Sequence, residues 1–192
     1  MMNPDGGLVE IYVQPGESHL TTEPAILRTL LGSCVAVAFL AAGRGVGALC
    51  HPMLPVCPAK LSNGSNRKSA ERYVDFAIRS LIDRFGTLGI ARDEMTVKLF
   101  GGADVLLVPT ETSRSSVGRM NSETALRVLR EQGLAIAASS LGGTSGLTLQ
   151  FNTRTGEVLV RRLNRSEPHS GRALTWGNVP AQVKNGRALG AK

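Results

Sequence analysis

Two short apolar segments joined by a glycine-containing turn stand out in the first third of the chain. Residues 33–40 read SCVAVAFL, residues 46–51 read VGALCH, and the turn AAGRG begins at residue 41. Small and β-branched apolar residues in runs of this length, bounded by glycines, are typical of buried strands. The pair therefore predicts a buried antiparallel β-hairpin.

The remaining residues up to about 163 alternate between strand and helix patterns. Further strands are expected at residues 8–13, 96–100 and 134–139, and as a hairpin at 147–151 and 158–162. Apolar residues at helical spacing predict a helix over 68–85 that stops at Gly86, and Asn121 or Ser122 is expected to cap a second helix that ends near Gln132. Polar or proline-containing loops are expected at residues 14–24, 21–31, 52–66 and 109–119. About seven strands and two helices indicate a mixed α/β (α+β) domain over residues 1–163.

Composition excludes several classes of protein. Hydrophobic residues make up 42% of the 192 residues, a fraction typical of globular proteins. The longest apolar run, residues 34–42, has about half the length of a membrane span. The opening MMNPDGGLVE has no pattern of a secretory signal, and three cysteines do not suit a disulfide scaffold. We therefore expect a cytoplasmic protein without membrane insertion.

The basic charge is concentrated at the end of the chain. Residues 161–192 contain seven Lys or Arg and one acidic residue, whereas residues 1–160 contain 15 basic and 14 acidic groups. Residues 164–192 are also rich in Gly, Ser, Asn and Pro, and we expect a disordered basic tail. An acidic partner or a membrane surface is the alternative role for this tail, and no nucleic-acid-binding motif accompanies it.

Cys34 and His51 are the residues most able to carry chemistry. Cys34 begins the first strand of the predicted hairpin and His51 ends the second, so both lie at one edge of the sheet. Antiparallel neighbours are about 5 Å apart, and an imidazolium beside a thiol lowers its pKa and activates it as a nucleophile. Backbone N–H groups around Gly32 and Ser33 can then hold an oxyanion. The alternatives are a buried Cys34 that only packs and a His51 without a partner.

No metal or organic cofactor is expected. The spacing of Cys50, His51 and Cys57 matches no common zinc pattern, and adjacent residues of a strand point to opposite faces. The GRGVG run at residue 43 lacks the spacing and the helix of a dinucleotide fingerprint.

Several collinear segments resemble the CheD family of chemoreceptor glutamine deamidases. They read TLLGSCVAV (29–37), VGALCHPMLP (46–55), RYVDFAI (72–78), KLFGGA (98–103), VGRMNSETA (117–125) and LGGTSGLTLQFNTRTGEVLVRRL (141–163). The resemblance covers roughly residues 8–163, and residues 164–192 have no part in it.

The resemblance implies a fold of stacked mixed β-sheets flanked by helices and a hydrolase without a cofactor. It implies that specific glutamines of methyl-accepting chemotaxis receptors are converted to glutamate, with Cys34 as nucleophile and His51 as base. The family's third catalytic residue is a Thr six positions before the Cys, where this chain has Arg28, so Thr29 is the candidate. Some relatives also bind a CheC-type phosphatase.

Other functions stay open from the sequence. A non-catalytic adaptor that binds chemoreceptors or the CheC-type phosphatase is the main alternative to the deamidase. A cysteine hydrolase that acts on a receptor methyl ester or on a host protein is a third reading, and nucleic-acid binding by the basic tail is the weakest.

Overall fold

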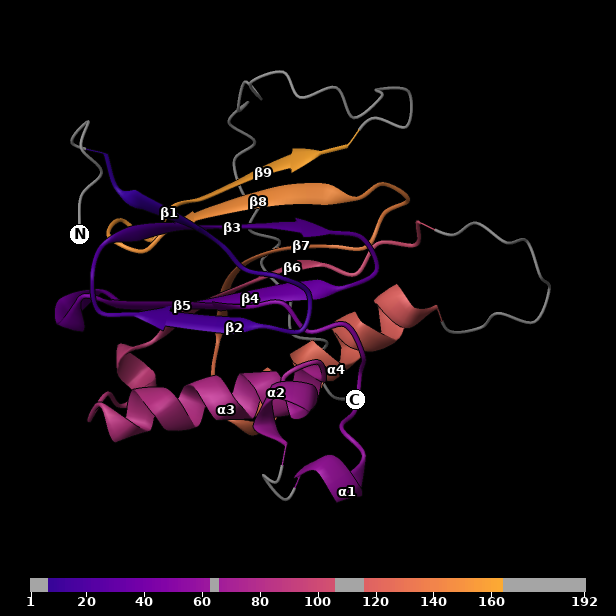
Figure 1. The fold of residues 1–192 in the computed structure, drawn as a ribbon, viewed down its shortest axis with the longest axis horizontal. Helices are drawn as coiled ribbons and strands as arrows, with labels where there is room; N and C mark the ends of the chain where they lie inside the picture. The colour runs from indigo at the N-terminus through magenta and orange to yellow at the C-terminus, as the bar shows by residue number, and fades with distance from the viewer. Residues whose placement is uncertain (1–6, 63–65, 106–115, 164–192) are drawn as a thin grey trace, which may run out of the picture.

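Short strands with buried faces build two β-sheets in this protein, which is described by a computed structural model over residues 7–62, 66–105 and 116–163. One sheet has the order β1-β3-β8-β9 and the other β2-β5-β4-β6-β7 (Figure 1). The strands are β1 (Val9–Tyr12), β2 (Ser18–Thr21), β3 (Ala25–Leu31), β4 (Val35–Ala41), β5 (Val46–Cys50), β6 (Thr96–Gly101), β7 (Ile136–Leu141), β8 (Leu147–Asn152) and β9 (Val158–Arg162). Both sheets contain parallel and antiparallel pairs.

The predicted central hairpin is confirmed. β4 and β5 pair antiparallel from Ala41↔Val46 to Val37↔Cys50, and every residue of both strands is buried. The turn is a short 3-10 helix, η1 (Ala42–Arg44), which ends at Gly45 with a φ of 65°. A strand that is buried on both faces needs no polar alternation, which explains its continuous apolar sequence.

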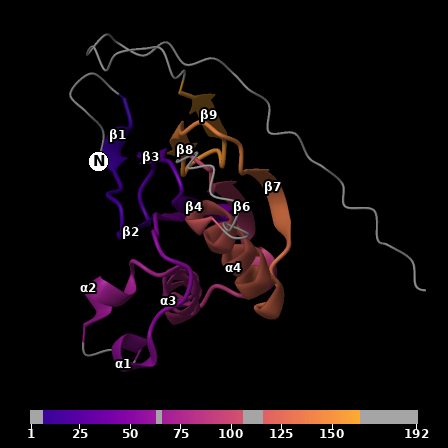
Figure 2. The ribbon, with the colours of Figure 1, turned by 90° about the vertical axis from the view of Figure 1, so that its right-hand side faces the viewer.

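Each face of the five-stranded sheet packs against a different layer, which confirms the expected stack of sheets flanked by helices. The inner face meets the four-stranded sheet through a buried apolar cluster that includes Leu27, Ala38, Leu49, Phe100 and Phe151. The outer face carries Val37, Phe39 and Val97 and is covered by α3 (Val74–Thr87) and α4 (Val117–Glu131). Figure 2 shows both helices on the side of β4 and β6 that faces away from β8 and β9.

The helix predicted over residues 68–85 is two helices in the structure, and a further four-residue helix precedes them within the predicted loop 52–66. They are α1 (Ala59–Ser62), α2 (Arg67–Ala70) and α3, and Gly86 lies inside α3 instead of ending it. The break occurs because Tyr73 is extended, with a φ of −104° and a ψ of 134°, and forms a bridge with Leu54. The carbonyl of Arg72 accepts the N–H groups of Met53 (2.8 Å) and Leu54 (3.0 Å). The helical pattern is interrupted so that this junction can hold the loop after β5.

The second predicted helix begins earlier than expected. Ser116 caps α4 and accepts the N–H of Arg119 at 3.1 Å, so the predicted caps Asn121 and Ser122 lie buried within the helix. The sequence around residues 113–122 offers several capping side chains, and local pattern alone does not choose among them. Residues 117–119 of the predicted loop are therefore helical, and residues 106–115 lie outside the described part.

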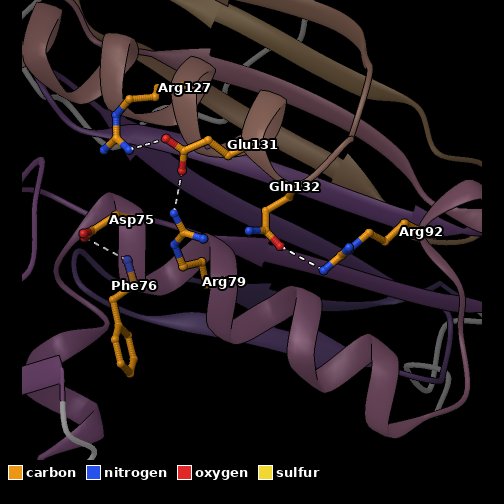
Figure 3. Close-up of polar contacts among 7 residues, drawn as sticks. All are labelled: Asp75, Phe76, Arg79, Arg92, Arg127, Glu131 and Gln132. Atoms are coloured by element: carbon orange, nitrogen blue, oxygen red, sulfur yellow. Dashed lines mark hydrogen bonds and ion pairs between the residues drawn. The ribbon is translucent and has the colours of Figure 1, made fainter.

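Side-chain contacts join α3 to α4 along their exposed surface (Figure 3). Glu131 accepts hydrogen bonds from Arg79 of α3 at 2.6 Å and from Arg127 of α4 at 2.7 Å. Gln132, just after α4, accepts one from Arg92 at 3.0 Å. Exposed pairs of this kind contribute about 0–1 kcal/mol each, so the buried apolar contacts hold α4 in place and these contacts only support them.

Two strands were not expected, and the predicted number of about seven is therefore too low for the described residues. β2 is a four-residue edge strand whose residues are all half-buried, so it has no clear polar alternation. β3 lies within the predicted loop 21–31, and its sequence AILRTLL has no regular alternation either. Within the described ranges no helix is long and apolar enough to cross a membrane. The predicted tail, residues 164–192, lies outside these ranges.

Candidate active site

The candidate residues gather where β3 ends and β4 begins. Residues 32–34 connect β3 of one sheet to β4 of the other (Figure 1). His51 follows the last residue of β5. Because β4 and β5 are antiparallel, the start of β4 lies beside the end of β5. The connection between the sheets therefore brings Thr29, Cys34 and His51 to one end of the stack.

Thr29 and His51 form a hydrogen bond between the two sheets. Thr29 points inward between Leu27 and Leu31, and it is 2% exposed, whereas its neighbour Arg28 points outward to Glu10 at 2.6 Å. The Thr29 Oγ1 lies 2.6 Å from the His51 Nδ1 and 2.8 Å from the carbonyl oxygen of Val13. Alternation along β3 explains why Thr29, and not Arg28, reaches the imidazole.

These contacts assign the protons of the imidazole. The Val13 carbonyl can only accept, so the Thr29 hydroxyl donates its single hydrogen to Val13. The Thr29 oxygen then accepts the N–H of His51 Nδ1, which places the lone pair of the neutral ring on Nε2. The opposite arrangement would leave an unprotonated Nδ1 facing the Val13 carbonyl at 3.4 Å.

The Nε2 atom of His51 is buried and has no hydrogen-bond partner among the described residues. Burial lowers the pKa of His51, because the charged ring is disfavoured away from water, although the Val13 carbonyl acts in the opposite direction. The imidazole is therefore neutral near pH 7 and presents an unused proton acceptor.

Cys34 lies diagonally across the strand pair from His51. The β4–β5 register continues through a hydrogen bond from the Val35 N–H to the Pro52 carbonyl at 3.3 Å. Continued to the next position, this register places Cys34 opposite Met53. Cys34 packs against the inner apolar cluster that contains Ala36, the residue that the same register places opposite His51. The Cα atoms of diagonal neighbours on paired strands are about 7–8 Å apart, and side chains as long as a thiol and an imidazole ring can meet across that distance.

The charge states of Cys34 and His51 differ from the activated thiol beside an imidazolium that the sequence suggested. Burial raises the pKa of the Cys34 thiol, which is only partly exposed, and the structure shows no hydrogen bond between this thiol and His51. The resting pair therefore consists of a neutral thiol and a neutral imidazole, not of a thiolate and an imidazolium. Hydrogen bonds of this kind often form only when substrate binds.

The backbone of residues 32–34 presents unused donors next to Cys34. The carbonyls of Gly32 and Cys34 accept the N–H groups of Ala103 (2.9 Å) and Gly102 (2.8 Å). Within the described part of the chain, the N–H groups of Ser33 and Cys34 donate no hydrogen bond. Two adjacent free N–H groups beside a thiol can bind a developing oxyanion.

Asn121 belongs to the site and was not predicted there. Its side chain is fully buried, and its Nδ2 donates to the carbonyls of Ser33 and Met53, both at 2.9 Å. The sequence signal was present in the segment VGRMNSETA, but an Asn that opens a helical pattern looks like a cap.

A pair of glycines lets β6 approach this connection closely. A side chain on Gly101 would meet the Cys34 carbonyl oxygen at 2.4 Å, and Gly102 has a φ of +67°. Steric crowding next to Cys34 therefore explains the two glycines of the FGGA motif. Lys98, which precedes it, donates to the Gly156 carbonyl at 2.9 Å and does not join the site.

The other cysteines lie apart from this site. Cys50 faces the helices, on the opposite side of β5 from His51, and complete burial raises its pKa to about 12. Cys57 lies in the loop after β5, where its N–H donates to Asp75 at 2.8 Å. The structure therefore does not bring Cys50, His51 and Cys57 together.

Comparison with known proteins identifies the family of this chain. The family model described as CheD chemotactic sensory transduction matches residues 53–162. A Geobacter sulfurreducens protein named "Probable chemoreceptor glutamine deamidase CheD 2" is 42% identical over 163 residues, which cover 85% of this chain and 96% of that protein. A Methanococcus maripaludis protein named "Probable chemoreceptor glutamine deamidase CheD" is 36% identical, covering 79% of this chain and 94% of the relative.

A solved structure, YlmD from Geobacillus stearothermophilus, matches 67% of this chain and 51% of its own at 14% identity. Its TM-score of 0.40 is too low to support any argument. The family match spans the loop after β5, α3, α4 and strands β6 to β9, and the two relatives cover 85% and 79% of this chain. The chain belongs to the CheD family.

Proposed function

We propose that this protein hydrolyses the side-chain amide of specific glutamines in chemoreceptors, yielding glutamate and ammonia. The observation that carries the proposal is the hydrogen bond between Thr29 and His51, which leaves the Nε2 of His51 as a free proton acceptor beside Cys34. The names of the relatives supply the substrate class, chemoreceptor glutamines. The family resemblance narrows the proposed substrates to methyl-accepting chemotaxis receptors.

The first half of the reaction forms a thioester. The Cys34 thiol transfers its proton to the Nε2 of His51 as the sulfur attacks the carbonyl carbon of the amide. The negative oxygen of the tetrahedral intermediate accepts hydrogen bonds from the N–H groups of Ser33 and Cys34. The intermediate collapses when the His51 imidazolium returns a proton to the amide nitrogen, the C–N bond breaks and ammonia leaves.

The second half restores the enzyme. A water molecule gives a proton to His51 and attacks the thioester carbon, and the same N–H groups hold the oxyanion. The C–S bond then breaks, the sulfur recovers its proton from His51, and the product is the glutamic acid side chain. No metal or organic cofactor takes part in these steps.

Thr29 keeps the base in its working form. By accepting the N–H of Nδ1 it favours the tautomer whose Nε2 carries the lone pair, and it fixes the ring plane. The same contact stabilises the imidazolium that forms during the reaction, because the hydroxyl oxygen can still accept that hydrogen bond.

A protein that modifies the cytoplasmic part of a receptor works in the cytoplasm, and this is the location that we propose. We also propose a CheC-type phosphatase as a partner of this chain, on the family resemblance alone. A non-catalytic adaptor that binds the receptors or this phosphatase is the alternative, and it would need no free Nε2 beside a thiol.

The test uses mass spectrometry of a receptor cytoplasmic fragment from the same cell. The fragment is incubated with the wild-type protein and with Cys34→Ala, and conversion of glutamine to glutamate is mapped by peptide. Conversion by the wild type alone supports the deamidase and Cys34 as the nucleophile. Conversion by both proteins contradicts the role of Cys34. Receptor binding without conversion by either protein favours the adaptor.

A further inference from the structure

The two loops that carry Cys34 and His51 separate just where their residues must cooperate. Val35 and Pro52 form a hydrogen-bonded pair of the β4–β5 ladder, but Pro52 has no N–H, so this pair has one hydrogen bond instead of two. The next such pair of an unbroken ladder would be Ser33 and Leu54. The Leu54 N–H donates instead to Arg72 at 3.0 Å, and the Leu54 carbonyl accepts from Val74 at 2.8 Å.

Asn121 bridges the gap that this separation leaves. One Nδ2 hydrogen goes to the carbonyl of Ser33, which precedes Cys34, and the other to the carbonyl of Met53, two residues after His51. The Asn121 amide thus replaces the donor that Leu54 would have given to Ser33. Both contacts are 2.9 Å long, and the side chain that makes them is fully buried.

The orientation of the Asn121 amide follows from its partners. Two carbonyl oxygens can only accept, so the amide nitrogen must face both of them and Oδ1 must point away. Oδ1 is buried and has no hydrogen-bond partner among the described residues. A side chain kept for packing alone would not need to bury a bare acceptor, whereas a bridge between two carbonyls does need a primary amide at this position.

We propose that Asn121 is a positioning residue that sets the separation of Cys34 and His51 by joining their loops to α4. The inference rests on the proposed function for its kinetic consequence, although the link between the loops is independent of the substrate. Without the Asn121 amide, no hydrogen bond among the described residues joins the Ser33 carbonyl to the loop that follows β5. The thiol and Nε2 then spend less time at a distance that permits proton transfer.

The first test is kinetic. Asn121→Ala is compared with Val128→Ala, which shortens a buried apolar side chain two turns further along α4, in the cluster between the helices and the sheet. We expect Asn121→Ala to lower kcat for glutamine conversion by about 10- to 100-fold, as misplacement of reacting groups does, with KM changed less than about threefold. Val128→Ala is expected to keep kcat within about twofold at a temperature where both variants are folded. A similar loss of kcat in both variants would overturn the proposal.

The second test does not depend on turnover. The rate of Cys34 alkylation by iodoacetamide is measured against pH in wild type, Asn121→Ala, His51→Ala and the double variant. Asn121→Ala is expected to shift the pH profile toward that of His51→Ala, and the double variant to match His51→Ala. Independent effects of the two substitutions would show that Asn121 does not act through the pair, even if receptor conversion is absent in wild type.

A second variant, which also lacks the unpaired Oδ1 of Asn121, keeps the test valid if Asn121→Ala does not fold. Asn121→Leu has a similar shape, removes both donors and removes Oδ1 as well, so it tests positioning if Asn121→Ala does not fold. We expect it to show the same shift in the alkylation profile. A wild-type profile in folded Asn121→Leu would overturn the proposal.

Discussion

Replacing Thr29 by valine tests the tautomer argument with little change in shape. Valine keeps the volume and the β-branched form that suit a strand, and it removes only the oxygen that lies 2.6 Å from His51 Nδ1 and 2.8 Å from the Val13 carbonyl. The Val13 carbonyl stays 3.4 Å from Nδ1 and is then the remaining acceptor for it. We expect the preference of the imidazole for the tautomer with a free Nε2 to weaken, because this carbonyl is a more distant acceptor than the Thr29 hydroxyl.

The size of the effect follows from the hydrogen bonds. A buried N–H that loses its acceptor costs about 1–3 kcal/mol, and every 1.4 kcal/mol is about tenfold in rate or equilibrium constant. Because the Val13 carbonyl partly replaces Thr29, we expect a loss near the lower end, about tenfold in kcat/KM. The free energy of unfolding should fall by roughly 1–2 kcal/mol, since the hydroxyl makes two contacts.

Thr153→Val is the matched control for this measurement. Thr153 is also buried, and its hydroxyl accepts the Ala25 N–H at 2.9 Å and contacts the Ala25 carbonyl at 3.2 Å, at the opposite end of β3. Activity is measured by mass spectrometry as conversion of glutamine in a receptor fragment. The free energy of unfolding is measured separately by urea unfolding. We expect both variants to lose similar stability and only Thr29→Val to lose activity. Activity of Thr29→Val within twofold of wild type would refute the tautomer argument.

Three further outcomes are expected. Iodoacetamide should modify Cys34 of the folded protein well before Cys50, which is fully buried with its pKa raised to about 12, and equal labelling would contradict this. Burial lowers the pKa of His51 and of His19, so the unfolded chain takes up protons below about pH 6.5 that the folded chain does not. The contribution of these two histidines to the free energy of unfolding is therefore fully present above about pH 6.5 and is lost as the pH falls from there through their lowered pKa values. Urea unfolding at pH 7 and at pH 5 measures this loss. His51→Gln should make the loss smaller. A chain that ends at residue 165 should melt cooperatively at the wild-type temperature, and a broad or lowered transition would show that residues 166–192 stabilise the domain.

The parts of the fold that were predictable are those where burial alone dictates the residues. The β4–β5 hairpin is apolar throughout because both its faces are covered, and the β8–β9 hairpin alternates because one face is covered. In β3 the pattern fails at the site itself, where Thr29 points inward and Leu30 outward with 40% exposure. A polar residue on the buried side conceals the strand from pattern analysis, and we propose that Thr29 takes this place because it orients His51.

The contacts that complete the site come from residues far apart in the chain. His51 reaches Thr29 across the two sheets, and Asn121 lies 88 residues from the Ser33 carbonyl that it binds. Register also decided a detail that the hairpin alone did not, since Cys34 and His51 are diagonal and not directly opposite. Local sequence indicated the two residues that we propose to react, and tertiary packing supplied the residues that contact them.

The neutral resting pair gives burial a direct role in the proposed chemistry. A base must be unprotonated to accept the thiol proton, and burial lowers the His51 pKa so that the ring meets this condition at neutral pH. Burial raises the Cys34 pKa, which makes the thiolate scarcer but a stronger nucleophile when it forms. Such a pair gains most when proton transfer and attack occur together, and this requires a fixed distance and a fixed tautomer. In our proposals, Thr29 fixes the tautomer of His51 and Asn121 sets the distance between Cys34 and His51.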